Sequence, residues 1–417
     1  MTAAWLLWLI LGILLIDTLF EQLLSWLNLR HHRPELPAAF VGQLDPDKYA
    51  RSVDYHRANY RLGTFQTLLS FPLIFLLIAM GGLGWLDTQL WTVTDRPLVH
   101  ALSFFGVLMF AGDLLGLPFQ WYRTFQIEGA FGFNKTTPRT FWIDKLKGWA
   151  VSLVVGGIVL SVLISLIGWL GQNFWLWFWL FISLFLLLVN IFYTTVLLPL
   201  FNKLEPLEDG PLRQQIEAYA AKVAFPLTHV YVMDGSRRST KANAFFSGLG
   251  RRKKVVLYDT LIEQHSPEEL VAVLAHEIGH YKKRHIIQSL VISVLHMGVL
   301  LFLLSRFVES PLLTEALGGT GTSLPLNLIA FGLLYSPVST LLGIGMNVFS
   351  RKNEYEADQY AAETYAAAPL SSALIRLHGE TLSNLTPHPW QVFVHYSHPP
   401  LVQRLEALQG GSVASAS

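Results

Sequence analysis

The chain contains no cysteine, and only 14% of its 417 residues are charged. The absence of cysteine excludes structural disulfides, cysteine-ligated zinc and thiol catalysis. Any metal ion in this protein must therefore be held by histidine and carboxylate side chains. The formal net charge of +1 reveals no excess of basic residues, so the sequence predicts no nucleic-acid partner.

Apolar residues form the largest part of the chain. Hydrophobic residues account for 52% of the chain, which has 13 Trp and 27 Phe, a composition typical of a polytopic membrane protein. Seven stretches approach the roughly 20 residues that a ~30 Å hydrocarbon core requires. The first lacks a basic n-region and a clear cleavage site, so it is expected to be a retained span. The seven are 5–27, 65–86, 98–119, 149–171, 174–199, 287–307 and 324–347.

Basic residues set the expected orientation of these spans. Lys and Arg are concentrated in segments 28–64, 120–148 and 200–286, whereas 87–97 and 308–323 carry almost none. The positive-inside rule places the basic segments, and with them the C-terminus, in the cytoplasm. The predicted parts are a five-span region (1–199), a cytoplasmic catalytic loop (200–286), spans six and seven (287–347), a C-terminal helical segment (348–409) and a disordered tail (410–417).

The cytoplasmic loop contains the main module outside the membrane. We predict a helix at 211–224 and short strands at 228–233, 242–247 and 253–258. A further helix begins at Ser266, a suitable N-cap, followed by Pro267 and two acids that suit a helix N-terminus. We expect this helix to continue through the basic residues 282–284 into span six. The predicted fold is an all-α polytopic membrane protein with a metallopeptidase module that contains a small β-sheet.

The helix that starts at Ser266 contains the segment His-Glu-Ile-Gly-His at 276–280. Residues four apart lie on the same helix face, so His276 and His280 are both candidate ligands of one metal ion. Glu277 then lies close enough to act on a water molecule at that ion. The competing interpretation is a pair of helix histidines that bind backbone carbonyls, with Glu277 a solvated charge.

A catalytic zinc site needs a third protein ligand. The segment Asn-Glu-Tyr-Glu-Ala-Asp at 353–358 follows span seven, on the side of the membrane expected for the two histidines. Glu354 and Asp358 share a helix face, whereas Glu356 points away from it. We therefore predict Glu354 as the ligand and Asp358 as the residue that orients a histidine ring. The alternative is a solvated acidic helix start, since helix N-termini favour acids.

Together these segments resemble the type I CAAX prenyl protease family of polytopic zinc metallopeptidases, which cleave near the C-terminus of prenylated proteins. The heat-shock membrane metalloproteases share the two metal-binding motifs but have fewer spans. The matching segments are 276–280, 354–358, Asn-Ala-Phe-Phe-Ser-Gly at 243–248, Ile-Glu-Gly-Ala-Phe-Gly-Phe-Asn at 127–134 and Tyr-Ser-His-Pro-Pro at 396–400.

The resemblance implies roles for individual residues. Glu354 is the third zinc ligand and Glu277 the general base. Asn243 and Ala244 belong to an edge strand that pairs with an extended substrate; the alternative for Asn243 is a turn or bulge residue. His398 is a candidate donor to the oxyanion or the substrate, or else a structural histidine. We also expect Arg404 to pair with an acid of the site.

Four polar residues fall inside predicted spans, where such residues usually face a bundle interior or a water-filled cavity. Near span ends, the alternative is that they reach the membrane interface. The aromatic residues in 173–182 are expected to form an interfacial belt. The four polar residues are Asp17, Asp113, Asn190 and His296.

The sequence thus predicts an integral-membrane zinc metalloendopeptidase, with one Zn²⁺ per chain and peptide or protein substrates, prenylated or not. Alternatives are a quality-control protease of the heat-shock type, an intramembrane-cleaving protease, and a zinc-binding transporter or scaffold without hydrolytic activity. The basic residues 282–284 place the motif near the membrane surface, which argues against intramembrane cleavage. Without an obvious retrieval signal at the C-terminus, a bacterial inner membrane is favoured over the endoplasmic reticulum.

Overall fold

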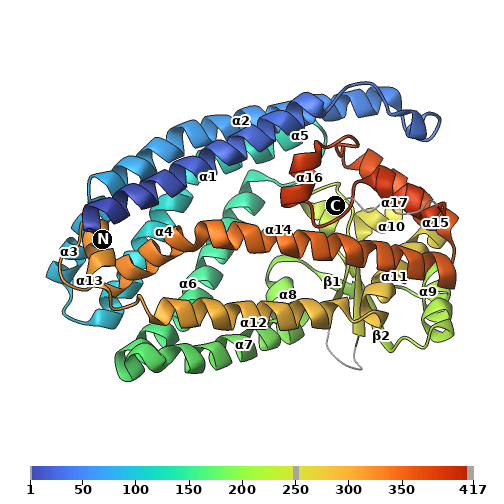
Figure 1. Cartoon of the computed structure of the whole chain (residues 1–417). Helices are drawn as coiled ribbons and strands as arrows, with labels where there is room; N and C mark the ends of the chain where they lie inside the picture. Colours follow the sequence, from blue (N-terminus) through green and yellow to red (C-terminus); the bar gives the residue numbers. More distant parts are fainter. Residues whose placement is uncertain (1, 248–252, 411–417) are drawn as a thin grey trace.

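The computed structural model describes residues 2–247 and 253–410. Long helices lie side by side over most of the molecule, and a small sheet with shorter helices lies at one end, on the right of Figure 1. The predicted all-helical membrane fold with a small sheet is confirmed. The predicted disordered tail, apart from Gly410, lies outside the described residues, as do Gly248, Arg251 and Arg252.

Six helical stretches in the described chain are long and apolar enough to cross a membrane. Seven spans were predicted, and the difference arises because Pro138–Phe201 contains both 149–171 and 174–199. Gly171, with a φ of +51°, ends the first helix of this stretch, and the turn Gly171–Asn173 leads into the second. The long helices are α1 (Ala3–His31), α2 (Pro46–Ala79), α4 (Pro97–Tyr122), α6 (Pro138–Leu170), α7 (Phe174–Phe192), α12 (His285–Ser305) and α14 (Leu324–Thr364).

The described residues form ten shorter α-helices besides these. α3 and α13 lie at the left-hand end in Figure 1, away from the sheet. The ten are α3 (Gly82–Val93), α5 (Glu128–Ala130), α8 (Leu198–Phe201), α9 (Pro211–Lys222), α10 (Asp259–Gln264), α11 (Pro267–Lys282), α13 (Pro311–Ala316), α15 (Ala367–Glu380), α16 (Pro389–His395) and α17 (Leu401–Leu408).

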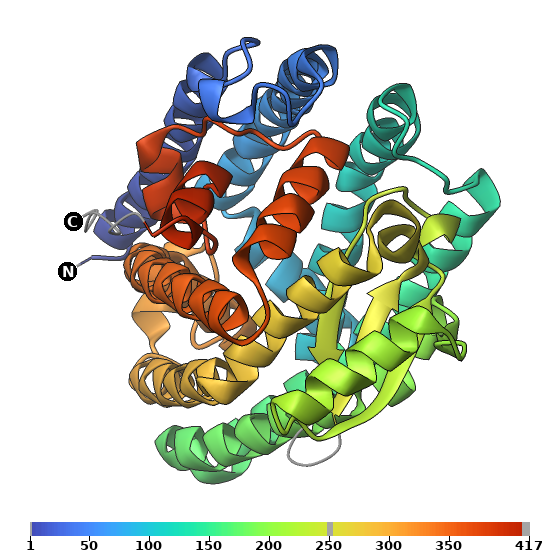
Figure 2. The same ribbon diagram turned by 90° about the vertical axis from the view of Figure 1, so that its right-hand side faces the viewer.

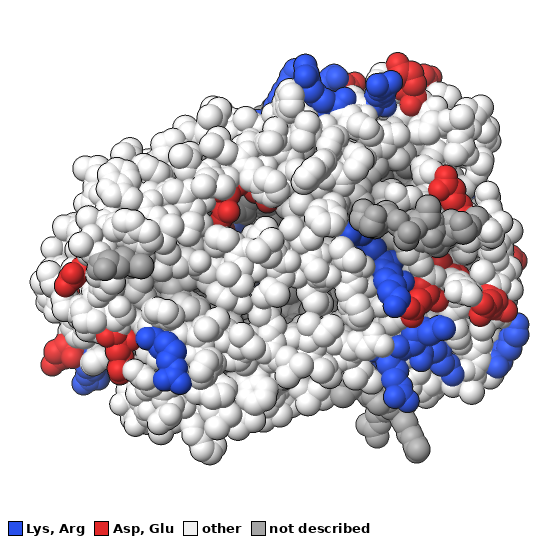
Figure 3. All heavy atoms as spheres, in the orientation of Figure 1, with Lys and Arg blue, Asp and Glu red and all other residues white. Residues whose placement is uncertain are grey.

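On the face shown in Figure 3, charged side chains are distributed as a bilayer requires. On the face in Figure 3 they gather at the two ends of the molecule, and the broad belt between the ends is almost free of them. The exception is an opening between α1 and α14, in which acidic side chains are visible. Because ionised groups are costly in hydrocarbon, the uncharged belt is the part of the surface that suits lipid.

The described residues form a sheet of four strands in the order β1-β2-β4-β3. β2 and β4 are parallel, whereas β1 and β3 run antiparallel to their neighbours, so β3 lies at one edge. The three predicted strands are confirmed; β1 was missed, since three residues are too few to show an alternating pattern. The strands are β1 (Leu204–Pro206), β2 (Leu227–Met233), β3 (Ala244–Ser247) and β4 (Lys253–Tyr258).

Helix α11 is the buried centre of this end of the molecule. Ser266 caps it as expected, in a capping box with Glu269. Ala272, Ala275 and Ile278 are completely buried. Seen from the right-hand end, α11 lies between the sheet and the C-terminal helices α14 and α15 (Figure 2). Burial on several sides holds the histidines of this helix in place.

The expected continuous helix from Ser266 into span six is wrong. α11 ends at Lys282, and α12 begins at His285. Between them Arg284 has a φ of +62°, a left-handed conformation that no α-helix accommodates. The break turns the chain, and it places His285 beside the metal-binding motif.

Helix α14 joins span seven to the acidic segment without a break. Its 41 residues start at Leu324, so Glu354 lies about 45 Å along the axis, beyond the ~30 Å of a hydrocarbon core. The predicted boundary at 347/348 therefore falls inside one helix. Glu354 reaches the same end of the molecule as the two histidines because this helix is longer than the bilayer.

The four polar residues within predicted spans all have hydrogen-bond partners. In three cases the partner is a side chain of another helix, so these residues join helices. The pairs are Asp17 with Ser336, Asp113 with Lys145 and Trp149, Asn190 with the backbone oxygen of Leu186, and His296 with Tyr335.

Gly279 generates the first prediction. A Cβ at this position would stand 3.0 Å from the Cα of Ala357 and 3.1 Å from its backbone oxygen. We expect Gly279→Ala to push α11 away from α14 and to weaken the predicted zinc binding by at least about tenfold, because the predicted ligands lie on different helices. Zinc affinity measured by competition with a chelator checks this.

The matched control is Gly345→Ala on α14, where an added Cβ meets nothing within 4 Å. This variant should bind zinc as the wild type does. Equal affinities for all three proteins would show that the close approach of the two helices is not required.

Candidate active site

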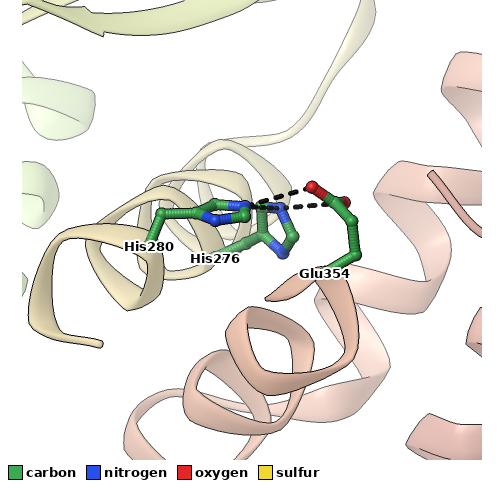
Figure 4. Close-up of side chains that lie close together, drawn as sticks. All are labelled: His276, His280 and Glu354. Carbon is green, nitrogen blue, oxygen red and sulfur yellow. Dashed lines mark hydrogen bonds and ion pairs between the residues drawn. The ribbon is translucent and has the colours of Figure 1, made fainter. Parts of the chain in front are cut away.

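His276 and His280 of α11 meet Glu354 of α14 at the sheet end of the molecule. One ligand atom from each residue lies within 4.8 Å of the others. The two Nε2 atoms are 3.2 Å apart, and the Glu354 carboxylate faces both rings (Figure 4). His280 Nε2 is 3.2 Å from Glu354 Oε1, and His276 Nε2 is 3.5 Å from Oε2.

The ring of His276 is held from behind by Asp358. The Nδ1 atom of His276 donates to Asp358 Oδ1 at 2.8 Å. Arg404 grips the same carboxylate with two hydrogen bonds, Nε to Oδ2 at 2.8 Å and Nη2 to Oδ1 at 2.6 Å. Its Nη1 lies 3.5 Å from Glu354 Oε2, so the expected pairing of Arg404 with an acid of the site is present, and with both acids.

The ring of His280 is held by a pair that sequence reasoning missed. His280 Nδ1 lies 3.0 Å from Nδ1 of His285, whose Nε2 lies 3.2 Å from Glu356 Oε2. His285 is only 3% exposed. The sequence feature that could have identified His285 is its position five residues after His280. That spacing indicates a contact only when the helix is known to break at Arg284. Glu356 points away from the ligand face, but it supports a ligand through His285.

These contacts assign protons in a way that fits a metal ion. Carboxylates only accept, so His276 donates from Nδ1 to Asp358, and His285 donates from Nε2 to Glu356. The free Nδ1 of His285 then accepts from Nδ1 of His280. Both Nε2 atoms are left with lone pairs that face each other, and the buried Glu354 Oε2 has no hydrogen-bond partner among the described residues. A cation between two imidazoles and a carboxylate would satisfy all three.

The pKa values agree that positive charge is favoured here. Burial works to lower the pKa of His280, but the hydrogen bond and charge of Glu354 outweigh burial and raise it above its usual value. Burial also opposes the charge of Arg404, yet its pKa is raised by Asp358 and Glu354. A cluster of buried carboxylates attracts cations, whether a proton or a metal ion.

Glu277 lies in a cleft of about 400 Å³ together with the three candidate ligands. It is half-buried, and among the described residues it has no hydrogen-bond partner. Its carboxylate is therefore free to accept a proton. The lining of the cleft also includes the apolar side chains of Leu261, Leu370 and Leu374.

Asn243 and Ala244 line the same cleft, where the chain enters the edge strand β3. The backbone oxygen of Asn243 accepts a hydrogen bond from the backbone N–H of Tyr258, the last residue of β4, at 3.1 Å. Its side-chain Oδ1 accepts from the N–H of Ala244 at 2.8 Å, which is a local turn-like contact. In the described sheet β3 pairs only with β4, so no described strand occupies its other edge.

His398 lies at the mouth of the cleft, and two further histidines line its wall. The side chain of His398 is 64% exposed, with Nε2 3.4 Å from Glu354 Oε1. His265 and His378 were not singled out from the sequence; each donates from Nδ1 to a carbonyl four residues earlier. Isolated histidines in helical segments carry no sequence signal that would distinguish these two.

Comparisons with known proteins agree with this arrangement. A family model described as "CAAX prenyl protease N-terminal, five membrane helices" matches residues 25–203, and "Peptidase family M48" matches residues 206–411. The chain is similar to a CAAX prenyl protease 1 homolog of Oryza sativa subsp. japonica, with 35% identity over 92% of this chain and 93% of the relative. The corresponding human protein is 31% identical over 91% and 89%.

A solved structure extends the similarity to the fold. The crystal structure of S. mikatae Ste24p matches with a TM-score of 0.91 and 29% identity, over 97% of this chain and 99% of the other. The relatives named here, with another from Saccharomyces cerevisiae, are eukaryotic. The preference for a bacterial inner membrane is therefore not supported; a multi-pass membrane protein is.

Asp358 provides the second prediction. Asp358→Asn keeps the shape of the side chain but removes the charge that orients His276 and balances Arg404. We expect zinc affinity to fall about 10- to 100-fold, as is typical when the partner of a metal-binding histidine is changed. Isothermal titration of the detergent-solubilised apoprotein with zinc measures this.

Glu363→Gln on the same helix is the control, because the exposed Glu363 bonds Gln359 alone among the described residues. If Asp358→Asn binds zinc as tightly as this control, Asp358 has no part in holding the metal ligand.

Proposed function

The chain belongs to peptidase family M48 and is a membrane metalloprotease; on that basis we propose that it is a zinc metalloendopeptidase of the CAAX prenyl protease type. The observation that carries the proposal is the convergence of His276, His280 and Glu354 beside Glu277, which has no hydrogen-bond partner among the described residues. A zinc ion bound there would supply Lewis acidity and lower the pKa of its water molecule towards ~7.

In this proposal Glu277 is the general base. It neighbours His276 on α11 and lines the cleft, and no hydrogen bond from a described residue competes for its carboxylate. It takes a proton from the attacking water and delivers it to the leaving amine. Asp358, Arg404, His285 and Glu356 keep the two imidazoles oriented while the carboxylate of Glu277 exchanges its proton.

The substrate peptide is held along β3. An extended peptide that adds to the edge that no described strand occupies gains backbone hydrogen bonds without requiring one sequence. Asn243 and Ala244 line the cleft that contains the candidate ligands, so a peptide paired there would pass the site of hydrolysis. His398, exposed at the mouth of this cleft, is proposed to donate to the oxyanion or to the substrate.

The substrates are membrane-associated proteins, including those with a prenylated C-terminal CAAX sequence. The printed names of the relatives support this class. The site lies beyond the apolar length of α14, next to the basic segment that the positive-inside rule assigns to the cytoplasm. Cleavage is therefore proposed to occur at the cytoplasmic face. A transporter or scaffold without hydrolytic activity does not fit membership in a peptidase family.

Glu277→Gln tests the mechanism. The amide cannot accept the proton of the attacking water, so kcat should fall by about 10²- to 10⁴-fold while zinc stays bound. Turnover of a farnesylated C-terminal peptide and of its unmodified counterpart should be measured with purified protein, alongside zinc content.

Glu268→Gln, in the first turn of the same helix, is the control and should retain full activity. Zinc-dependent turnover at the wild-type rate in Glu277→Gln would contradict the role given to Glu277. Hydrolysis of neither peptide by the wild-type enzyme would contradict the proposed substrate class.

A further inference from the structure

The glycine- and phenylalanine-rich motif at 127–134 is not a part of the metal site, yet it touches the chain just before the proposed substrate strand. Asn134 forms an isolated antiparallel bridge with Ser239. The N–H of Lys135 donates to the oxygen of Arg238 at 3.0 Å, and the N–H of Thr240 donates to the oxygen of Phe133 at 3.1 Å. Residues 128–136, here called the brace, thus hold the backbone of 238–240.

The side chain of Lys241 ties this contact together. Its Nζ donates to Glu128 Oε2 and to the hydroxyl of Tyr55, each at 2.9 Å. Tyr55 OH in turn donates to Glu128 Oε1 at 2.5 Å. The ammonium also lies 4.4 Å from the ring centre of Phe133, a cation–π contact with the brace. Three distant parts of the sequence therefore meet at Lys241, two residues before Asn243.

The other side of the same segment is held by α10. Thr260 donates to the backbone oxygen of Lys241 at 3.1 Å, and Gln264 donates to that of Thr240 at 2.9 Å. Upstream, Arg238 is anchored to Asp144 of α6 by two hydrogen bonds, of 2.7 and 3.0 Å. The chain thus enters β3 from a segment held on both sides, whereas β3 itself has only one neighbouring strand in the described sheet.

We propose that Lys241 is a positioning residue, and that the brace sets the register of β3 against the metal site. This inference rests on the proposed pairing of substrate with β3. Side chains and hydrogen-bonding groups alternate along a strand, so a slip of one residue presents the wrong face. An edge strand paired on one side only is least constrained where it begins, and Lys241 holds that point to the membrane half of the protein.

The test separates register from general stability through the substrate. One peptide is compared with an analogue that is N-methylated at one backbone amide, which removes a donor needed for strand pairing. Wild-type kcat/KM should favour the parent peptide by about tenfold or more, the scale of one or two lost hydrogen bonds with their steric cost. In Lys241→Met, kcat/KM for the parent peptide should fall about tenfold because KM rises. The kcat/KM of the N-methylated analogue should scarcely change.

Two further variants sharpen the comparison. Lys241→Arg keeps the positive charge and the hydrogen-bond donors. Its kcat/KM for the parent peptide should therefore lie within about threefold of the wild-type value. Lys48→Met is the matched control: Lys48 pairs with Glu380 at 2.6 Å and is 35% exposed, against 34% for Lys241, but its partner lies on α15 and not in the brace. This variant should keep the full preference for the parent peptide. Zinc content and melting temperature are measured for every variant.

The ratio of kcat/KM for the two peptides supports or overturns the role proposed for Lys241. A preference that collapses in Lys241→Met but not in Lys48→Met supports the proposal, whereas equal losses for both peptides overturn it. If the wild type itself does not distinguish the peptides, pairing with β3 fails, and the inference fails with it; hydrolysis by Glu277 stands. If Lys241→Met loses zinc or does not fold, Tyr55→Phe, which removes the hydroxyl that bonds both Lys241 and Glu128, is judged by the same ratio, and an unchanged ratio there overturns the proposal.

Discussion

Helices α11 and α14 approach each other so closely that a Cβ added at Gly279 would stand only 3.0 Å from the Cα of Ala357 on α14. The site depends on this contact, because the two histidines lie on one helix and Glu354 on the other. A difference of a few tenths of an ångström in the helix separation moves a ligand atom by a comparable amount. Glycine inside the His-Glu-Ile-Gly-His segment therefore has a packing role as well as its place in the motif.

The charges around that contact are balanced in a particular way. Glu354, Asp358 and Arg404 are each at most 6% exposed, and buried charges are tolerated only when they are paired. One guanidinium serves two carboxylates, which leaves one negative charge uncompensated among these three groups. The lone pairs of His276 and His280 point to the same place. This excess of negative charge, more than any single distance, favours a cation at the cluster.

The N-terminal segment matched by one family model and the C-terminal segment matched by the other contact each other beside the candidate site. Glu128 and Lys241 are 113 residues apart and belong to different family models, yet they form an ion pair beside the entrance to β3. Arg238 makes a second connection to α6 through Asp144. The membrane helices thus do more than anchor the protease module; they hold the backbone that leads into its edge strand.

The sequence by itself determined the features that depend on spacing along one element: the apolar spans, the capped helix that begins at Ser266, the shared face of His276 and His280, and the three longer strands. Helical periodicity and span length are local, so they can be read from residue order. Only the tertiary structure revealed the features that depend on contacts between secondary-structure elements. These are the break at Arg284, the support of His280 by His285 and Glu356, and the brace around Lys241. These contacts follow from how helices pack and where the chain turns, and no local pattern of residues encodes them.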